Sequence, residues 1–578
     1  MSYNLVFTKL TDLSICENSI LFIDYNCLNN IVDNYFDQNF KIAKSYGYEK
    51  KKMESDFVEV KKYCETLIEE LGKILNEYHD IKFSNKQWQI LLSLWTHRTI
   101  SLLLNRFKKI EKTFNENKIS SITLYKNNLI DLVNHKTADI SHNSNNQYWN
   151  NIIFDEIIKF KNIDVKKNYI NKKKNDQSNT DKTSLLNEFK IGIKELTNIL
   201  NRNKIKESKS LIIDSCLPKK ENKKFLKHYN QPKIYINSNF KSDKELNMDL
   251  RQKLENKINL STHDEFYRFV TSIIFKIFPS CYLENFQNLV NKCNESILPK
   301  KPKFIFTSNA MDTNEIFKIY LCKNLPYTKY YGGQHGGATP IYKFGVLDTY
   351  LFDQMDGFFN WGWQNTENNF QSFMLPKLTK LKKLKKNNKI AIMLRPMMHA
   401  TSTWDKSEEA LILFKKTIEF IEKCKNLSFY DKIFIKAYPN ITCKINNFRN
   451  WKKYSSIKNF DYNQPSFDKY KEGCDLNIFT YESTGFFQLI NINKPTIILF
   501  SSFNKDIKDQ YKSDFDKLAK VGIIHYEHES LLKHLSKIDN KINSWWFSNL
   551  VQEKINTFKN KFASDSKDFK FLTKKIKY

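Results

Sequence analysis

The stretch Tyr330-Tyr-Gly-Gly-Gln-His-Gly-Gly-Ala-Thr339 leads from an apolar, strand-like approach into a glycine-rich turn. It holds four of the chain's 13 glycines within ten residues, and these glycines flank a single histidine, His335. Glycine permits positive φ angles and a close approach of backbone to ligand. A tight turn with an incidental histidine is the simpler interpretation, but such a turn rarely needs two Gly-Gly pairs. The pattern therefore predicts a functional site around His335.

Strand-like runs alternate with helical periodicity on the N-terminal side of this stretch. The predicted strands are residues 3–8, 19–24, 210–215, 233–237 and 303–308, and the predicted helices are 26–79, 87–106, 185–201, 243–297 and 314–323. Alternation of this kind indicates a parallel sheet, whose ligands bind at the C-terminal strand ends. Asn309 and His335 both follow predicted strands, so we expect both residues at such an edge. The two tryptophans of 87–106, Trp88 and Trp95, lie seven residues apart and are expected in the core.

The C-terminal part repeats the alternation. Its predicted strands are residues 389–394, 431–436, 475–480, 495–500 and 521–526, with helices at 405–424, 486–492 and 528–562. Five such repeats predict a second Rossmann-like sheet. The predicted fold class is therefore α/β, with two Rossmann-like doubly wound domains facing a cleft and a helical N-terminal elaboration.

Two polar stretches help to divide the chain. Residues 377–389 hold seven lysines in 13 positions and predict a linker between an N-terminal domain at 1–376 and a C-terminal domain at 390–578. The same lysines could instead form a patch for an anionic membrane surface. Residues 165–184 are polar and lysine-rich, which predicts a mobile surface loop.

Polar side chains follow the strands of the C-terminal half: Arg395, Lys436 and the run Glu482-Ser483-Thr484-Gly485. In a doubly wound sheet these strand exits line one crevice. Ser483 or Thr484 would cap the following helix, whose first N–H groups can hold a phosphate. Arg395 and Lys436 could neutralise a diphosphate, and Glu482 could accept hydrogen bonds from a ribose. Capping alone, and ordinary salt bridges or solvent exposure for the two cations, are the simpler alternatives.

Bulk composition narrows the class of protein. The 578 residues carry a net charge of +30, but the lysines are spread along the whole chain, as a compositional bias would also produce. We see no arginine-rich tract or zinc-finger spacing, so nucleic acid is not an expected partner. The ten cysteines form no CxxC pair, which favours reduced thiols over a zinc site or a disulfide framework. No signal peptide or apolar run of membrane-spanning length is visible, so we expect a cytoplasmic protein, or one peripheral on the inner face of the membrane.

Motif searches exclude several enzyme classes. The chain has no GxxxxGK[ST] loop, no GxGxxG after the first strand of either half and no GxSxG elbow. Two Rossmann-like domains instead suit group transfer from a nucleotide-linked donor. His335 would be the base that takes a proton from an acceptor hydroxyl, while Asn309, Gln334, Gly336 and Gly337 would contact the acceptor. With no convincing metal ligands, we expect a metal-independent reaction that needs no cofactor besides the nucleotide-sugar donor.

A family resemblance rests on motifs spread from about residue 80 to residue 562. They include Trp88-Gln-Ile-Leu-Leu-Ser-Leu-Trp95, Thr307-Ser-Asn-Ala310, Gln334-His-Gly-Gly337, Trp361-Gly-Trp363, Thr480-Tyr-Glu-Ser-Thr-Gly485 and Trp545-Trp546. With these motifs the chain resembles the transferase family found in O-antigen and other surface-polysaccharide loci of bacteria. Lys436 stands where the family pattern has arginine, which loses the bidentate fork, and Gln488 stands where it has glutamate.

The resemblance implies a GT-B-type glycosyltransferase of lipopolysaccharide or other surface-polysaccharide biosynthesis. Its partners would be a nucleotide-linked sugar and a glycan or lipid-linked glycan acceptor, with peripheral contact to an anionic membrane. A polyol-phosphate transferase using a CDP-linked donor is the alternative enzyme. A non-enzymatic scaffold that binds anions or membranes is the alternative from another class.

Overall fold

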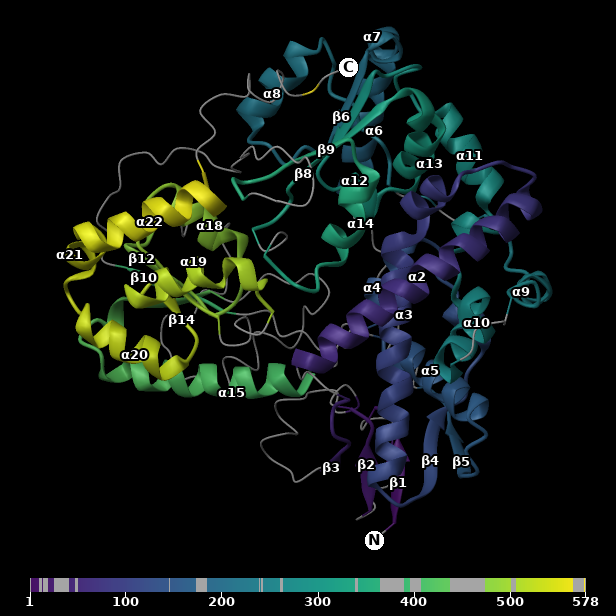
Figure 1. Ribbon diagram of the computed structural model, residues 1–578, viewed down its shortest axis with the longest axis horizontal. Helices are drawn as coiled ribbons and strands as arrows, with labels where there is room; N and C mark the ends of the chain where they lie inside the picture. The colour runs from purple at the N-terminus through teal and green to yellow at the C-terminus, as the bar shows by residue number, and fades with distance from the viewer. Residues whose placement is uncertain are drawn as a thin grey trace. The chain divides into compact units, whose positions relative to one another are not determined.

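The computed structural model describes residues 2–9, 13, 19–24, 27, 41–46, 50–144, 146–172, 185–238, 240, 243–259, 264–337, 341–363, 389–394, 407–436, 473–500, 506–564 and 576 (Figure 1). The chain divides into two compact units. Unit 1 comprises Met1–Asp214, Tyr229–Tyr330 and His399–Glu408, and unit 2 comprises Ser215–His228, Tyr331–Met398 and Glu409–Tyr578. The strand that leads to His335 is divided between the two units after Tyr330, and the domain boundary predicted at 377–389 stays a prediction.

Unit 1 begins with a parallel five-stranded sheet in the order β3-β2-β1-β4-β5. Its strands are β1 (Tyr3–Val6), β2 (Ile20–Phe22), β3 (Lys41–Ile42), β4 (Ile119–Tyr125) and β5 (Lys166–Ile170). The first strand pairs with both β2 and β4, so the strand order reverses beside it, as in a Rossmann sheet. Leu5 and Ile122 are completely buried on this sheet, which shows that it belongs to the core.

A pair of long helices, α2 (Lys50–His79) and α3 (Asn85–Glu116), packs within the same unit. Ser84 starts α3 with a capping box, in which Ser84 and Gln87 satisfy each other's backbone N–H groups. Trp88 and Trp95 are 1% and 0% exposed, so their predicted core position is confirmed. A Cβ placed on Gly72 of α2 would lie 2.7 Å from Cδ1 of Trp88. Glycine at this position therefore lets the two helices approach closely.

A four-stranded sheet, β6-β7-β8-β9, contains the strand that leads to His335. Its strands are β6 (Ser210–Ile213), β7 (Phe304–Thr307), β8 (Lys329–Gly333) and β9 (Gly357–Phe359). Strands β8 and β9 run parallel, with Gly332 opposite Phe358. A Cβ on Gly332 would meet the sulfur of Met355 at 2.2 Å, so this glycine is required by packing.

Unit 2 contains a parallel five-stranded sheet in the order β11-β10-β12-β13-β14. Its strands are β10 (Ile390–Met393), β11 (Ile433–Lys436), β12 (Leu476–Phe479), β13 (Thr496–Leu499) and β14 (Ile524–His525). Figure 1 shows α15 (Ser407–Lys423) and α20 (His528–Lys537) on one side of this sheet, and α18 (Thr484–Asn491) and α22 (Asn549–Phe562) on the other. Helices on both faces make it a doubly wound sheet.

The aromatic core of unit 2 lies on the α18 face of this sheet. Phe486 of α18 packs edge-on against Phe558 of α22, and Phe515 of α19 (Asp509–Lys520) contacts both Phe500 and Phe558. All four rings are at most 2% exposed. Burial of this apolar area stabilises α18 in place, since a helix of eight residues is marginal alone.

The remaining helices are distributed over both units. Those of unit 1 are α4 (Ile140–Asn143), α5 (Gln147–Phe160), α6 (Leu185–Leu200), α7 (Arg202–Glu207), α9 (Met248–Glu255), α10 (Glu265–Ile277), α11 (Phe286–Glu295), α12 (Ala310–Thr313) and α13 (Glu315–Asn324). Those of unit 2 are α8 (Lys219–His228), α14 (Val346–Gln354) and α21 (Ile542–Trp546). Short 3₁₀ turns lie at Leu129–Leu132, Thr137–Asp139, Ser280–Tyr282, Leu325–Tyr327, Cys424–Asn426 and Tyr430–Lys432.

The α/β class and the second Rossmann-like sheet are confirmed, while parts of the N-terminal prediction are wrong. That part of the chain contributes two sheets where the sequence suggested one. Residues 233–237 form no strand, and residues 41–42 and 166–170 are strands rather than helix and loop. Short edge strands such as β3 and β5 carry too few apolar residues to be distinguished by periodicity. Residues 173–184 and 377–388 lie outside the described residues, and the predicted facing domains with a cleft stay a prediction.

Candidate functional site

The order of the sheet in unit 2 locates a ligand-binding edge. Strand β10 pairs with β11 on one side and with β12 on the other, so the connection reverses direction between β10 and β12. In doubly wound sheets ligands bind outside the carboxyl ends of the strands at this reversal. Thr480 joins the two strand ends, because its backbone N–H and its hydroxyl both donate to the Met393 carbonyl at 3.0 Å. The edge between Leu394 and Thr480 is therefore the expected ligand position.

The predicted run Glu482-Ser483-Thr484-Gly485 stands at this reversal. Ser483 is the N-cap of α18, and its Oγ accepts a hydrogen bond from the Gly485 N–H at 3.1 Å. Its capping role is thus confirmed, as the simpler interpretation also required. Glu482 and Ser483 are both half-buried. The first N–H groups of a helix carry a partial positive charge, so this N-terminus favours an anion.

The glycine-rich turn meets the same helix. The Gly337 N–H donates to Oγ1 of Thr484 at 3.2 Å. A Cβ on Gly337 would lie 2.2 Å from Cδ2 of Phe487, one turn further along α18. Glycine at 337 is therefore needed for the close approach of the turn to the helix. This contact joins the glycine-rich turn to the Glu482–Gly485 run, two motifs that lie far apart in the sequence.

Gln334 fixes the shape of the turn. Its side chain is buried at 2% exposure, and its Nε2 donates to the Gly336 carbonyl at 2.8 Å. Its Oε1 accepts from the Trp361 N–H at 2.8 Å and from the Trp363 indole N–H at 2.9 Å. These bonds connect two motifs of the family resemblance, and they make Gln334 a residue that positions the turn. Contact between Gln334 and an acceptor stays a prediction.

His335 is exposed and lies beside a cysteine that the sequence did not indicate. Nδ1 of His335 is 3.1 Å from Sγ of Cys216, and both residues belong to unit 2. Cys216 has a φ of 55°, a left-handed conformation that is uncommon for a residue other than glycine and is often found at functional sites. The only feature of the sequence that could have indicated Cys216 as a site residue is its position just after the strand β6.

The Cys216 contact controls which nitrogen of His335 can act as a base. If the Nδ1–H donates to Sγ, the lone pair is on Nε2, at the exposed side of the ring. A thiol that donates to Nδ1 would produce the other tautomer, in which Nε2 carries the proton. The cysteine therefore has the position that an orienting group takes next to a histidine base.

The other predicted site residues are placed differently. Lys436 is the last residue of β11 and is 7% exposed; its partner in β10 is Met393, which also pairs with Phe479 of β12. Two strand spacings thus separate Lys436 from the β12 end, about 10 Å across the backbone. Asn309 is in unit 1, where it precedes α12. Arg395 lies outside the described residues.

A further titratable group at a strand end, His525, makes its hydrogen bonds inside the fold. His525 in β14 is 7% exposed; its Nε2 lies 3.1 Å from the Gly522 carbonyl and its Nδ1 2.9 Å from Ser530 Oγ. Burial lowers the pKa of His525 to about 4.

Neither a metal cluster nor a membrane span occurs in the described part of the chain. Among the residues that the structure describes, no three histidine, cysteine or carboxylate side chains are close enough to hold a metal ion. Over the same ranges, no helix is both long and apolar enough to cross a bilayer. Metal independence stays a prediction.

The sheet is doubly wound, and polar residues follow its strands beside the capped helix α18, which makes this an α/β protein whose expected ligand edge is at the carboxyl ends of the strands. The chain belongs to the LIC12162 family of transferases, whose model matches residues 3–576. The family resemblance to transferases is thus confirmed, and the assignment to O-antigen loci stays a prediction. Comparison with curated proteins finds no match.

Solved structures with some similarity include three of the wall teichoic acid polymerase TagF. A histidine-to-asparagine variant soaked with CDPG is 12% identical over 68% of this chain and 96% of that chain, with a TM-score of 0.30. A histidine-to-alanine variant is 12% identical over 68% and 97%, with a TM-score of 0.29. TagF itself is 11% identical over 68% and 96%, with a TM-score of 0.28. TM-scores this low do not support conclusions about the fold or the reaction of this chain, so those conclusions depend on the observed topology and site alone.

Proposed function

We propose that this transferase moves a sugar from a nucleotide-linked donor to a hydroxyl of a surface glycan or lipid-linked glycan. One observation carries the proposal: the Gly337 N–H donates to Thr484 Oγ1 at 3.2 Å. This bond brings the His335 turn to the N-terminus of α18, at the reversal point of the sheet. A base and an anion-binding helix end on one side of a doubly wound sheet are the elements that such a transfer requires.

The donor diphosphate would lie at the N-terminus of α18. The Thr484 N–H, at the first helical position, would donate to a phosphate oxygen, and the helix dipole favours the negative charge. Lys436 would supply a positive charge from the end of β11, two strand spacings from the end of β12, and Arg395 would supply another. Glu482 would accept hydrogen bonds from the ribose hydroxyls. Asn309, Gly336 and Gly485 keep their predicted roles as contacts of the acceptor and the donor.

His335 would act on the acceptor. Its Nε2 takes the proton of the attacking hydroxyl, while its Nδ1–H donates to Sγ of Cys216. The hydroxyl oxygen forms a bond to the anomeric carbon, and the bond between that carbon and the donor phosphate breaks. The leaving nucleotide diphosphate carries away the negative charge, which α18 and Lys436 stabilise.

Nucleotide binding tests the donor half of the proposal. Titration calorimetry of the folded chain with CMP, UDP, GDP and CDP is expected to show binding of at least one. Failure of all four to bind would contradict the proposal. Product analysis then identifies the transferred group: phosphorus in the acceptor product would assign the reaction to polyol-phosphate transfer from a CDP-linked donor instead.

Substitution of the histidine tests the base. His335→Ala is expected to lower the transfer rate by about 10²- to 10⁴-fold, the usual contribution of a general base, with nucleotide affinity within about twofold. His142→Ala is the matched control, because His142 is also exposed but lies in α4 of unit 1. Unchanged turnover in His335→Ala would remove this residue from the mechanism.

A further inference from the structure

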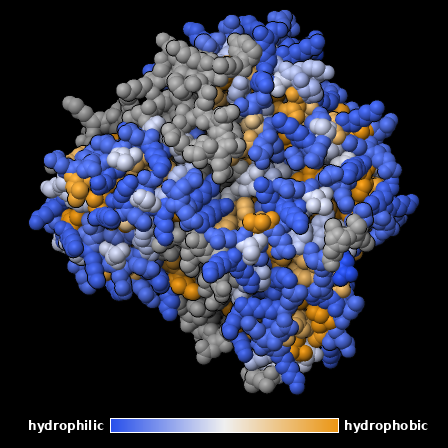
Figure 2. Space-filling view, in the orientation of Figure 1, coloured by the Kyte–Doolittle hydropathy of each residue, from blue (hydrophilic) through white to orange (hydrophobic). Residues whose placement is uncertain are grey.

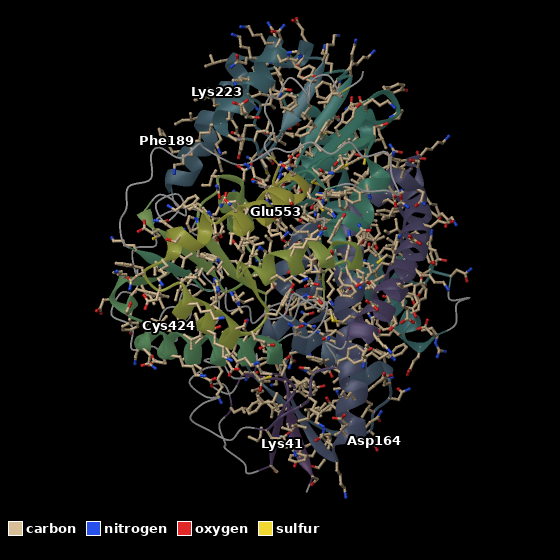
Figure 3. The ribbon with its side chains drawn as sticks, turned by 60° about the vertical axis from the view of Figure 1, so that its left-hand side comes forward. Lys41, Asp164, Phe189, Lys223, Cys424 and Glu553 are labelled. Atoms are coloured by element: carbon tan, nitrogen blue, oxygen red, sulfur yellow. The ribbon has the colours of Figure 1, made fainter. Side chains whose placement is uncertain are left out.

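Helix α6 presents an apolar face to solvent. Phe189, Ile193, Leu196 and Leu200 are 69%, 49%, 59% and 85% exposed. A Cβ added to Gly192, in the middle of the helix, would have no atom within 4 Å. Figure 3 labels Phe189 on this helix. Single exposed apolar residues are normal on protein surfaces, but these four share one side of the helix, and Ile199 next to them is 57% exposed as well.

The polar side of α6 is the side that faces the protein. Asn198 is 7% exposed; its Nδ2 donates to the Tyr235 carbonyl at 2.6 Å, and its Oδ1 accepts from the Tyr235 N–H at 3.1 Å. Lys194 lies over the Tyr235 ring at 4.7 Å. At about 100° per residue, Asn198 is about 180° from Phe189 around the helix.

The same geometry groups the apolar residues. Ile193, Leu196 and Leu200 fall within about 40° of Phe189 when each residue advances about 100°. The apolar stripe is therefore directed away from the Asn198 contact. Ordinary surface helices have the opposite arrangement, with the apolar stripe against the core. Burial within unit 1 does not account for these four side chains.

The positive charge of the chain favours an anionic partner for the apolar face of α6. Lys190, Arg202 and Lys204 are exposed on α6 and the following helix α7, together with the acidic Glu195, and the whole chain carries a net charge of +30. Two copies of such a chain repel each other, whereas an anionic bilayer attracts it. The described part of the face shown in Figure 2 is mostly hydrophilic, so general surface hydrophobicity does not explain the stripe.

We propose that α6 is a membrane-docking helix that lies in the plane of an anionic bilayer, with Phe189, Ile193, Leu196 and Leu200 inserted at the acyl boundary. Amphipathic helices with basic flanks bind in this way through apolar burial and attraction to anionic lipid. The docking surface differs from the lysine-rich stretch at 377–389 that the sequence suggested. It is independent of the reaction that the His335 site performs.

Flotation of the full chain with vesicles tests the docking surface. Wild-type protein is expected to float with vesicles of phosphatidylcholine and about 30% phosphatidylglycerol, and much less with phosphatidylcholine alone. Phe189→Glu should lower the partition coefficient at least about tenfold. Val58→Glu is the matched control, since Val58 in α2 is 70% exposed and the charge change is the same. This control should change partitioning by less than about twofold.

Three results would overturn the proposal. The first is absence of wild-type binding to anionic vesicles. The second is an equal loss in Phe189→Glu and Val58→Glu, which would report charge alone. The third is a wild-type dimer in sedimentation velocity that Phe189→Glu converts to a monomer without changing flotation, which would assign the stripe to a second copy. Leu196→Ser, with folding checked by circular dichroism, provides a second variant that adds no charge and should lose at least about fivefold.

Discussion

Gly337→Ala is the sharpest test of the contact between the His335 turn and α18. The added methyl group would lie 2.2 Å from Cδ2 and 2.7 Å from Cε2 of Phe487, well inside van der Waals contact. The ring cannot easily move, because it is 3% exposed and stacks on Phe558 at a centroid distance of 6.1 Å. Overpacking of this kind costs about 1–3 kcal/mol. We expect the melting temperature of unit 2 to fall by roughly 5 °C.

The functional effect should exceed the loss of stability. Displacement of the turn by about 1 Å would misplace His335, and a misplacement of this size can reduce turnover about 100-fold. Calorimetric melting and transfer kinetics of the full chain measure the two effects. Phe487→Leu makes room for the methyl group, so the double variant should recover about 1 kcal/mol relative to additivity.

Gly192→Ala supplies the matched control for the same chemical change. Its Cβ would meet nothing within 4 Å, and alanine is favoured over glycine in a helix interior. We therefore expect Gly192→Ala to stabilise α6 by about 0.5–1 kcal/mol and to leave turnover unchanged. A Gly337→Ala variant as stable and as active as wild type would refute the close approach of the turn to Phe487.

Two further predictions follow from other contacts. Cys216→Ala removes the sulfur that lies 3.1 Å from Nδ1 of His335, so turnover should fall about tenfold and the pH profile of turnover should shift. Cys216→Ser should retain most of the activity. If Cys216→Ala is as active as wild type across the pH range, Cys216 does not orient His335. Burial holds the pKa of His525 at about 4, whereas the pKa of histidine in the unfolded chain is near 6.5. The contribution of His525 to stability is therefore fully present above about pH 6.5 and is lost as the pH falls toward 4, because only the unfolded chain binds the proton in that range. His525→Gln should therefore reduce the loss of stability between pH 7 and pH 5 by about 2 kcal/mol in urea unfolding, and an unchanged pH slope would contradict this.

Strand and helix alternation was predictable where strands are buried on both faces. The runs at 303–308, 389–394 and 475–480 are rich in apolar residues, and each contains a strand of the structure. Such runs carry a strong signal because a parallel sheet is covered by helices on both sides. The run at 233–237 has the same apolar composition, yet Tyr235 pairs its backbone with the side chain of Asn198 instead of a neighbouring strand. Composition could not distinguish these two outcomes.

The sequence predicted individual residues of the candidate site, but it did not predict which of them lie close together. Ser483 and Lys436 were predicted because they stand at the ends of predicted strands, and His335 was predicted because glycines flank it. Cys216 was missed, because a cysteine after a strand has no distinctive local pattern. Its proximity to His335 spans 119 positions of sequence and arises only when β6 and β8 enter the same sheet. Contacts of that range depend on strand order, which local propensity does not encode.

The sequence by itself determined that the chain is α/β, that its C-terminal part winds five parallel strands, and that His335 sits in a turn built for close contact. Local periodicity and glycine chemistry are sufficient for these features. Only the tertiary structure decided what the turn touches: Thr484 and Phe487 of α18. It also decided that the apolar side of α6 faces outward, since the anchoring bond of Asn198 to Tyr235 joins segments 37 residues apart. Periodicity predicts which residues share a face, whereas packing decides which way that face points.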